Sequence, residues 1–303
     1  MLKNTDFQKK IMTLFPEMDL RLNESMASHT SFRIGGPAEV MLFPKSAEEL
    51  SKVLKTTATL DIKPMILGAG TNVLAPDGGI AGLVICLKDA LDGMEQLDDT
   101  RIRIFAGVTM TRGAVFAAAR NLGGLEFAHG IPGTVGGGVY MNAGAYGGEI
   151  CDVCESVDVM SMDGQITTIS REDMKFSYRH SRLEDEGGIV VSAVFALTPK
   201  PEAEIRSYMQ ELMTRRKTSQ PLDLPSAGSA FKRPVGGYAA ALIDQAGLKG
   251  YQVGGAAVSE KHAGFVVNKE NASAADVKTL LKNVSDIVFE KSGIRLEPEV
   301  RIW

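Results

Sequence analysis

The chain has 303 residues, of which 44% are hydrophobic and 23% charged, and its formal net charge is -4 at pH 7. This length allows two compact domains, and the near-neutral balance does not favour binding to nucleic acid or to an anionic membrane. No stretch approaches the roughly 18 consecutive apolar residues of a membrane span, and the first two dozen residues lack the apolar core of a signal peptide. We therefore expect a cytoplasmic protein without a nucleic-acid or membrane partner.

Three cysteines, Cys86, Cys151 and Cys154, are too few and too unevenly placed for a disulfide framework. Cys151 and Cys154 have the spacing of a metal or redox pair. No second pair follows, however, and the four histidines form no HxxxH pattern. We expect reduced, structural thiols and no metal site.

The first half of the chain alternates between predicted strands and helices. Phe7, Ile11 and Leu14 fall at helical spacing and predict a leading helix that Pro16 ends. Ser46, with Glu49 three residues on, predicts the start of a second helix. A third, rich in alanine, is expected over 111–122 with Gly123 and Gly124 as its cap. Strands are expected at 39–43, 63–67, 83–87 and 101–106.

The second half begins with strands and then becomes helical. Strands are expected at 156–160, 165–169 and 188–197. Pro199 and Pro201 flank a lysine and favour an extended connector, which predicts domains at 1–198 and 199–303. Beyond it we expect helices at 202–217, 238–246 and 273–291, and strands at 264–268 and 299–302. The fold class expected is α+β.

Residues 129–145 form a stretch that is crowded with glycine and poor in charge. Glycine lets another group approach the backbone closely, and successive free N–H groups can hold an anion such as a phosphate. The apolar residues Val135, Val139 and Met141 favour burial over the other interpretation, a flexible surface loop. This stretch is predicted to lie against a cofactor.

A second glycine turn, 68–72, follows the predicted strand 63–67. It lacks the third glycine and the following helix of the dinucleotide fingerprint, so a Rossmann fold is disfavoured. Its main-chain N–H groups could still bind a pyrophosphate.

Several motifs in order along the chain resemble one known family. These are residues 68–74, 130–137, 141–145, 176–181, 227–232 and 297–301. Together they resemble the UDP-N-acetylenolpyruvoylglucosamine reductase (MurB) family, from about residue 31 to the end. The length matches the shorter subclass, which lacks an inserted loop over the substrate.

The resemblance implies an FAD-binding domain of the vanillyl-alcohol-oxidase (PCMH) type, in two lobes, followed by a smaller α+β substrate domain. It implies a monomer with non-covalent FAD and with NADPH as co-substrate. The substrate would be a UDP-sugar, whose enolpyruvyl ether is reduced to give UDP-N-acetylmuramate for peptidoglycan synthesis. The residues implied to hold FAD are Arg33, Gly68, Ala69, Gly70, Thr71, Asn72, Val73, Gly130, Pro132, Gly133, Thr134, Gly136, Gly137, Asn142, Ala143 and Gly144.

The resemblance assigns catalysis to Arg179, Ser229 and Glu299. Arg179 is permanently cationic and could hold a carboxylate or enolate; a surface ion pair is the other interpretation. Ser229 lies in a turn of small residues and by resemblance donates a proton. By resemblance Glu299 assists enol stabilisation or proton supply, whereas its place on a predicted strand would also suit an ion pair with Arg301.

Candidates for substrate binding are Tyr178, Lys232, Arg233, Tyr238 and His262. Each could instead be ordinary surface, and many family members carry asparagine where Arg233 stands.

Three other functions stay open. Ser229 and Lys232 have the SxxK spacing of serine acyl-transfer enzymes, but the companion motifs are absent. A flavin oxidase with flavin bound covalently to His129, and a flavin-fold binding module without catalysis, are the other two.

Overall fold

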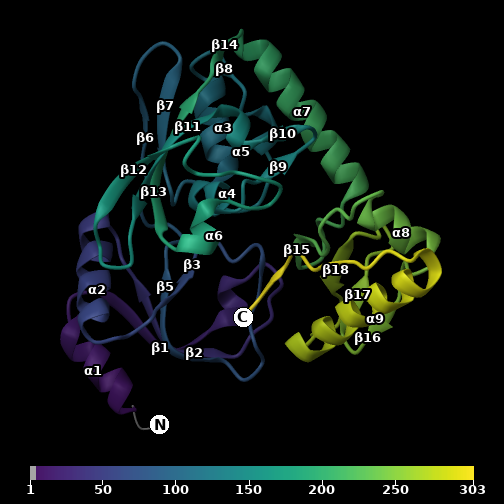
Figure 1. Cartoon of the computed structure of the whole chain (residues 1–303), viewed down its shortest axis with the longest axis horizontal. Coiled ribbons are helices and arrows are strands. Elements are labelled where there is room, and N and C mark those ends of the chain that lie inside the picture. Colours follow the sequence, from purple (N-terminus) through teal and green to yellow (C-terminus); the bar gives the residue numbers. More distant parts are fainter. Residues whose placement is uncertain (1–4) are drawn as a thin grey trace. The chain divides into compact units, whose positions relative to one another are not determined.

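The computed structural model describes residues 5–303 (Figure 1). The contacts between its residues divide the chain into two compact units. Unit 1 consists of the described residues up to Arg21 together with 40–69 and 82–215. Unit 2 consists of 22–39, 70–81 and 216–303. These units differ from the predicted division at 198/199, because two early segments join the carboxyl-terminal part. The predicted domain boundary itself stays a prediction.

Both helices predicted near the amino terminus form, and each has a side-chain cap at its start. In α1 (Asp6–Leu14) the Thr5 hydroxyl accepts from the Gln8 N–H, and the Gln8 side chain accepts from the Thr5 N–H. In α2 (Ala47–Thr59) the predicted N-cap, Ser46, accepts from the Glu49 N–H at 3.2 Å. Both caps satisfy N–H groups that the first helical turn leaves unpaired.

The first sheet has the strand order β1-β2-β5-β3. Its strands are β1 (Asp19–Ser25), β2 (Pro37–Phe43), β5 (Ile80–Cys86) and β3 (Met65–Leu67). β3 and β5 are parallel, and β3 leads directly into the glycine turn. The following segment is β4 (Val73–Leu74) and not a helix, so the expectation of a non-Rossmann turn is confirmed.

A five-stranded antiparallel sheet in unit 1 has the order β12-β11-β13-β7-β6. These strands are β6 (Met94–Gln96), β7 (Arg101–Phe105), β11 (Cys154–Met160), β12 (Ile166–Ser170) and β13 (Ile189–Ala196). The central strand β13 is buried from Ile189 to Phe195, and every residue of this run except Ser192 is apolar. The strands predicted at 101–106, 156–160, 165–169 and 188–197 are therefore confirmed.

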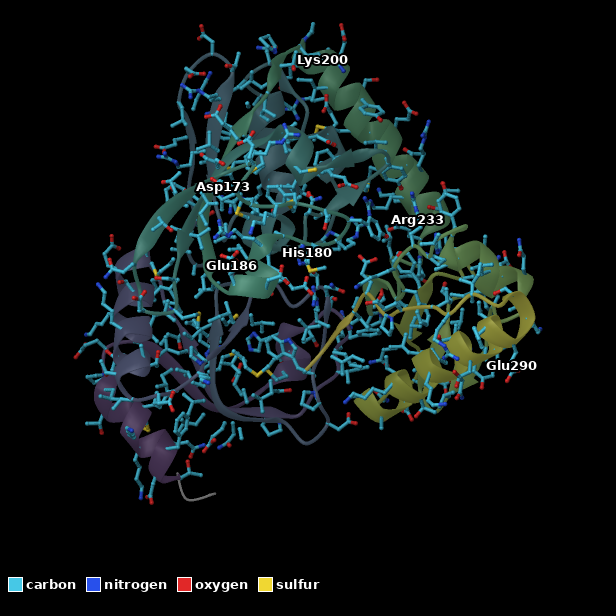
Figure 2. The ribbon with its side chains drawn as sticks, in the orientation of Figure 1. Asp173, His180, Glu186, Lys200, Arg233 and Glu290 are labelled. Atoms are coloured by element: carbon cyan, nitrogen blue, oxygen red, sulfur yellow. The ribbon has the colours of Figure 1, made fainter. Side chains whose placement is uncertain are left out.

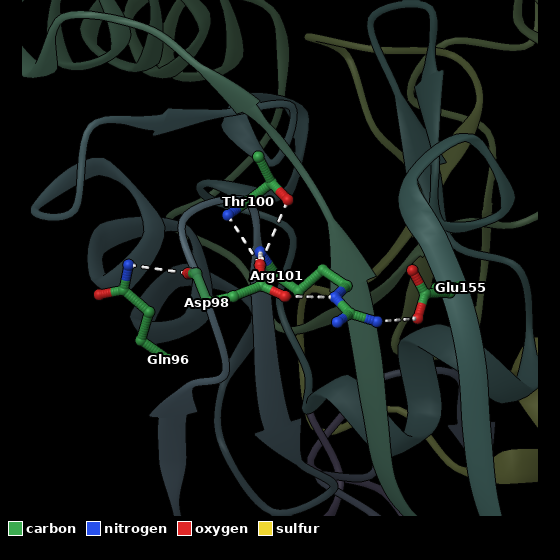
Figure 3. A network of polar contacts seen from close by, with 5 residues as sticks. All are labelled: Gln96, Asp98, Thr100, Arg101 and Glu155. Carbon is green, nitrogen blue, oxygen red and sulfur yellow. Dashed lines mark hydrogen bonds and ion pairs between the residues drawn. The ribbon is translucent and has the colours of Figure 1, made fainter.

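Asp98 fixes the turn between β6 and β7 (Figure 3). One of its carboxylate oxygens accepts from the N–H groups of Thr100 and Arg101, both at 2.9 Å. The other oxygen pairs with the Arg101 guanidinium at 2.7 Å, and this guanidinium also forms an ion pair with Glu155 at 3.2 Å. These bonds lower the pKa of Asp98 to about 2, the Thr100 N–H bond contributing most. An aspartate that binds its own following backbone is a local signal for a turn.

The alanine-rich helix is shorter than predicted. α3 (Met110–Ala118) ends before Asn121, which has a φ of 58°. The predicted Gly123 cap instead belongs to β8 (Leu122–Gly123), which pairs with β14 (Thr198–Pro199). Asparagine tolerates the left-handed conformation, and Asn121 adopts it after α3 at the place where a glycine was expected to end the helix. Pro199 therefore lies in a strand and not in a free connector.

Unit 2 contains the sheet β15-β18-β17-β16. Its strands are β15 (Ser226–Ser229), β18 (Phe265–Asn268), β17 (Ala256–Val258) and β16 (Gln252–Val253). Helices α8 (Ala239–Gln245) and α9 (Ala274–Ser292) share one apolar core with this sheet. Phe32, Ile34 and Leu74 complete that core. The long helix α7 (Glu202–Ser219) precedes β15 in the chain. Helices α7, α8 and α9 confirm the predicted helices at 202–217, 238–246 and 273–291.

The last strand is shorter than predicted. β19 (Arg301–Ile302) pairs in parallel with β4, so Glu299 precedes the strand instead of lying on it. The remaining short elements are η1 (Met26–His29), η2 (Glu126–Ala128), α4 (Val135–Tyr140), β9 (Gly144–Ala145), β10 (Gly148–Glu149), α5 (Ile150–Val153) and α6 (Arg182–Glu186).

Within residues 5–303, no helix combines the length and the apolar character that crossing a membrane needs. The same residues contain no group of three His, Cys, Asp or Glu placed to hold a metal ion. Burial raises the pKa of Cys154 to about 12 and also raises that of Cys151.

Candidate active site

The glycine-rich stretch in unit 1 is tied to the strand and helix beside it. Thr134 is the N-cap of α4, and the first two N–H groups of this helix bond to carbonyls outside it. Val135 donates to the Val108 carbonyl at 2.8 Å, and Gly136 donates to the Ala106 carbonyl at 2.9 Å. Gly130 donates to the Thr111 hydroxyl at 3.1 Å. The stretch is thus a fixed part of unit 1 and not a flexible loop.

At most glycine positions of this stretch, the backbone conformation or the packing of the protein itself disfavours a larger residue. Gly130 and Gly133 have φ values of 86° and 116°, which disfavour any other residue. At Gly136 an added Cβ would lie 2.8 Å from the Ala106 Cβ, and at Gly138 it would lie 2.7 Å from the Met110 sulfur. At Gly144 it would lie 2.7 Å from the Gly148 carbonyl oxygen.

At Gly68 and Gly137, neither the backbone conformation nor the packing disfavours a larger residue. Neither glycine has a positive φ. Among the described residues, the sole atom near a Cβ added at either one is Thr134 Oγ1, at 3.5 Å from Gly68 and 3.9 Å from Gly137. Both are ordinary contacts. The two predicted glycine segments therefore converge on the buried Thr134, and they leave bare backbone that packing does not explain. This is the arrangement that close approach of a cofactor requires.

Arg179 lies in a tight turn. Ser177 and His180 exchange two backbone hydrogen bonds, of 3.0 and 3.1 Å, which leaves Tyr178 and Arg179 as the two turn residues. Arg179 has a φ of 57°, a conformation that costs a non-glycine residue about 1 kcal/mol. Its guanidinium donates to the Gly144 carbonyl at 3.1 Å and lies 5.1 Å from the centre of the Tyr178 ring. Arg179 is half-buried, as its aromatic neighbours indicate.

Asn142 joins this turn to the glycine-rich stretch. Its side-chain amide donates to the Glu149 carboxylate at 2.9 Å and to the Ser177 carbonyl at 3.0 Å. Its oxygen accepts from the Cys151 N–H at 2.9 Å, and its own N–H donates to Val139 at 3.1 Å. Asn142 is fully buried. Its side-chain amide and its N–H are therefore used within unit 1, and the predicted contact of Asn142 with FAD stays a prediction.

In unit 2, Ser229 ends strand β15 with its side chain exposed. The pairing of β15 with β18 shifts register between Ser226 and Ser229. Gly228, with a φ of 77°, lies in this irregularity. A bulge redirects the residue that follows it, which explains how a strand residue becomes available to a ligand.

Glu299 lies beside this strand end. Its N–H donates to the Ala230 carbonyl at 2.9 Å, and Phe231 and Pro298 form a bridge. The side chain of Asn72 donates to the Glu299 carbonyl at 3.2 Å, and the Asn72 carbonyl accepts from the Arg301 N–H at 3.0 Å. Unit 2 therefore brings together two predicted catalytic residues and the end of the first glycine turn.

The other predicted cofactor residues of unit 2 lie close in the chain to this cluster. Gly70 has a φ of 63°, and a side chain there would collide with the His29 carbonyl. Its own carbonyl accepts from the Ser31 N–H at 3.0 Å. Arg33 is exposed and has a φ of 55°. Thr71 lies between Gly70 and Asn72, and Val73 pairs with Arg301 in β4 and β19.

The predicted substrate residues also belong to unit 2, except Tyr178. Lys232 forms an ion pair with Glu297 at 2.6 Å, so part of its charge is already used. The Arg233 guanidinium, labelled in Figure 2, lies 4.5 Å from the centre of the Tyr238 ring. Neither Ser229 nor Lys232 lies on a helix.

His262 lies in the turn before β18. The Gly264 N–H donates to its Nδ1 at 3.1 Å, and the Gly264 carbonyl accepts from Ala230, next to Ser229, at 2.8 Å. Burial lowers the pKa of His262, so the ring is neutral at pH 7. Because Nδ1 accepts, the proton is on Nε2.

Three residues that support these clusters were not predicted. The Ser181 hydroxyl donates to the Tyr140 carbonyl at 2.7 Å, and the Ser31 hydroxyl to the Ser226 carbonyl at 2.6 Å. Asp77 accepts from the first two N–H groups of α9, from Ala274 at 2.7 Å and Ala275 at 3.0 Å. Each bond joins residues far apart in the sequence, which no local pattern signals.

Comparison with known proteins identifies the family of this chain. The family described as "UDP-N-acetylenolpyruvoylglucosamine reductase, C-terminal domain" matches residues 220–303, and an "FAD binding domain" family matches 38–170. The UDP-N-acetylenolpyruvoylglucosamine reductase of Agathobacter rectalis is 47% identical over 99% of this chain and 98% of its own. The Streptococcus pneumoniae enzyme is 44% identical over 97% of each chain.

The crystal structure of the Thermus caldophilus reductase superposes with a TM-score of 0.77 at 35% identity, covering 95% of this chain and 99% of that one. The predicted fold class, an FAD-binding domain followed by a smaller α+β domain, is confirmed. The chain belongs to the UDP-N-acetylenolpyruvoylglucosamine reductase family and is an FAD-dependent oxidoreductase of this kind.

Proposed function

We propose that this protein reduces the enolpyruvyl ether of UDP-N-acetylglucosamine to UDP-N-acetylmuramate, a step of peptidoglycan precursor synthesis, with NADPH as reductant. The names of its relatives support the substrate. The observation that carries the proposal is the cluster in unit 2, where the backbone of Glu299 bonds both Ala230, next to Ser229, and Asn72. An exposed proton donor and a carboxylate are thus held close to a segment predicted to bind the cofactor.

Non-covalent FAD fits the bare backbone at Gly68 and Gly137. The contacts we propose are those that the family resemblance implies: Arg33, Gly68, Ala69, Gly70, Thr71, Asn72 and Val73, together with Gly130, Pro132, Gly133, Thr134, Gly136, Gly137, Asn142, Ala143 and Gly144. When bound, FAD supplies the hydride that is added to the substrate, and NADPH restores it.

The chain's own residues handle charge and protons. Addition of hydride to the enol ether leaves negative charge on the carbon that bears the carboxylate. Arg179, a permanent cation with a rigid fork of donors, stabilises that charge, and Glu299 assists in stabilising the enol or in supplying the proton. Ser229 then donates a proton to the same carbon. A free serine is a weak acid, so this step depends on its surroundings.

The nucleotide diphosphate needs donors and cations. We assign them to Lys232, Arg233 and the Nε2–H of His262, with Tyr178 and Tyr238 as neighbouring aromatic contacts. The neutral His262 donates one hydrogen bond without adding charge. Lys232 would have to exchange its bond to Glu297 for the substrate.

Replacement of Ser229 tests this mechanism. Its side chain is exposed, and among residues 5–303 no hydrogen bond to its hydroxyl is found, so Ser229→Ala should fold normally. NADPH should still reduce the flavin of Ser229→Ala, whereas turnover of the enolpyruvyl nucleotide should be abolished. Turnover at the wild-type rate would contradict the assignment of Ser229. Loss of flavin reduction would instead indicate a damaged cofactor site.

Two simple measurements separate the other flavoprotein functions. After acid precipitation, yellow colour in the supernatant excludes a covalent link to His129. A flavoprotein that does not oxidise NADPH when the enolpyruvyl nucleotide is present would be a binding module. Light scattering during gel filtration tests the predicted monomer.

A further inference from the structure

The Arg179 turn is fastened to residues 140–144 at three points. The Ser181 hydroxyl donates to the Tyr140 carbonyl, the Asn142 amide donates to the Ser177 carbonyl, and the Arg179 guanidinium donates to the Gly144 carbonyl. These bonds enclose the turn from both of its ends. All three use carbonyl or amide groups of one short segment.

Ser181 bonds to the distant Tyr140 carbonyl instead of capping the helix that follows it. It is the N-cap of α6, where a serine hydroxyl ordinarily accepts from the first helical turn, yet it makes no such bond. Its hydroxyl points to Tyr140 and is fully buried. A residue that breaks a local rule in favour of a distant bond indicates a functional constraint.

The side chain of Asn142 is also used entirely for bonds within unit 1. Asn142 adopts a φ of 43°, and both of its amide hydrogens and its oxygen are bonded within unit 1. A buried amide with every group paired holds its partners in fixed places. Figure 2 marks His180, which follows Arg179 and closes the turn that these bonds hold.

We infer that Asn142 and Ser181 are positioning residues, which hold the Arg179 guanidinium where the negative charge develops. This rests on the proposed function, in which Arg179 stabilises the enol. Their loss would let the turn relax from its unfavourable φ and move the guanidinium. A displacement of about 1 Å can reduce a rate by about a hundredfold.

The test compares two buried serines of the FAD-loaded enzyme. Ser181 and Ser192 are 0% and 1% exposed, and each donates one hydrogen bond of 2.7 Å, Ser192 to Asp158 on the neighbouring strand β11. Ser192→Ala loses a bond to a carboxylate and should lower the melting temperature at least as much as Ser181→Ala, which loses a bond to a carbonyl. Stopped-flow absorbance then measures flavin reduction by NADPH and flavin reoxidation by the enolpyruvyl nucleotide.

We expect Ser181→Ala to reoxidise about tenfold more slowly, with flavin reduction unchanged, and Ser192→Ala to match the wild type in both. Asn142→Asp, which keeps the shape but loses both amide donors, should be slower still. Hydrogen exchange of residues 175–183, measured without substrate, should rise in Ser181→Ala and in Asn142→Asp but not in Ser192→Ala. Faster exchange together with wild-type reoxidation would overturn the inference.

Arg179→Ala completes the test. If Ser181 acts through Arg179, adding Ser181→Ala to Arg179→Ala should slow reoxidation no further. A second tenfold loss in the double variant would show that Ser181 acts by another route, which refutes the inference alone. Wild-type reoxidation in Arg179→Ala itself would instead refute the role given to Arg179 in the proposed function.

Discussion

Two adjacent glycines of α4 should respond in opposite ways to the same added methyl group. At Gly137 an added Cβ would have one neighbour within 4 Å among residues 5–303, the Thr134 hydroxyl at 3.9 Å, and φ is negative. Gly137→Ala should leave the flavin-free protein as stable as the wild type, or more stable by up to about 1 kcal/mol, since alanine favours helix. At Gly136 the Cβ would lie 2.8 Å from the Ala106 Cβ and 3.2 Å from the Ala106 carbonyl oxygen.

The clash at Gly136 is with backbone and a short side chain, which cannot move aside. Overpacking of this kind costs about 1–3 kcal/mol, partly offset by the gain in helix propensity, so Gly136→Ala should lose about 1–2 kcal/mol. Urea unfolding of both flavin-free variants measures these differences.

The affinity of Gly137→Ala for FAD is a separate measurement, made on the same flavin-free protein. If the cofactor lies against Gly137, the added methyl group should overpack that contact at a similar cost of about 1–3 kcal/mol. This corresponds to a dissociation constant that is about 5- to 150-fold larger. Quenching of flavin fluorescence on titration with flavin-free protein measures it. Gly137→Ala with wild-type affinity for FAD would refute our explanation of its bare backbone.

Two further predictions concern stability. Asp77→Ala removes the acceptor of the first two N–H groups of α9, so the free energy of unfolding should fall by about 1 kcal/mol in urea; an unchanged value would mean that Ser273 caps the helix alone. Burial lowers the pKa of His262 below 6.5, so below that pH the unfolded chain takes up a proton that the folded chain does not. Stability should therefore fall as pH drops from 7.5 to 5.5, and the fall should be smaller in His262→Asn, whose side-chain oxygen can replace Nδ1 as acceptor for Gly264. Equal pH dependence in both proteins would contradict a buried neutral histidine.

Local signals in the sequence predicted most of the secondary structure. Ser46 with Glu49 marks a helix start because a cap and its helix are neighbours in the chain. The end of α3 was missed because Asn121 took the left-handed position instead of the nearby glycines. Propensity alone does not distinguish the two.

The candidate site was predictable only in part. Motif resemblance identified the family, which the comparisons confirm. It did not reveal that Asn142 holds the Arg179 turn, or that Asn72 bonds the Glu299 carbonyl. The latter bond joins residues 227 positions apart, and such pairings are visible only once the chain has folded.

The composition of unit 2 has a consequence for how the chain folds during synthesis. Its core combines Phe32, Ile34 and Leu74 with residues from 227 to 300, and its strand β4 pairs with β19 at 301–302. These early segments emerge from the ribosome long before their partners, and they must remain unpaired in the meantime. Closing such long loops is slow and leaves apolar surface open to aggregation. Folding of unit 2 should therefore be the late, chaperone-sensitive step, completed only when β19 has been released.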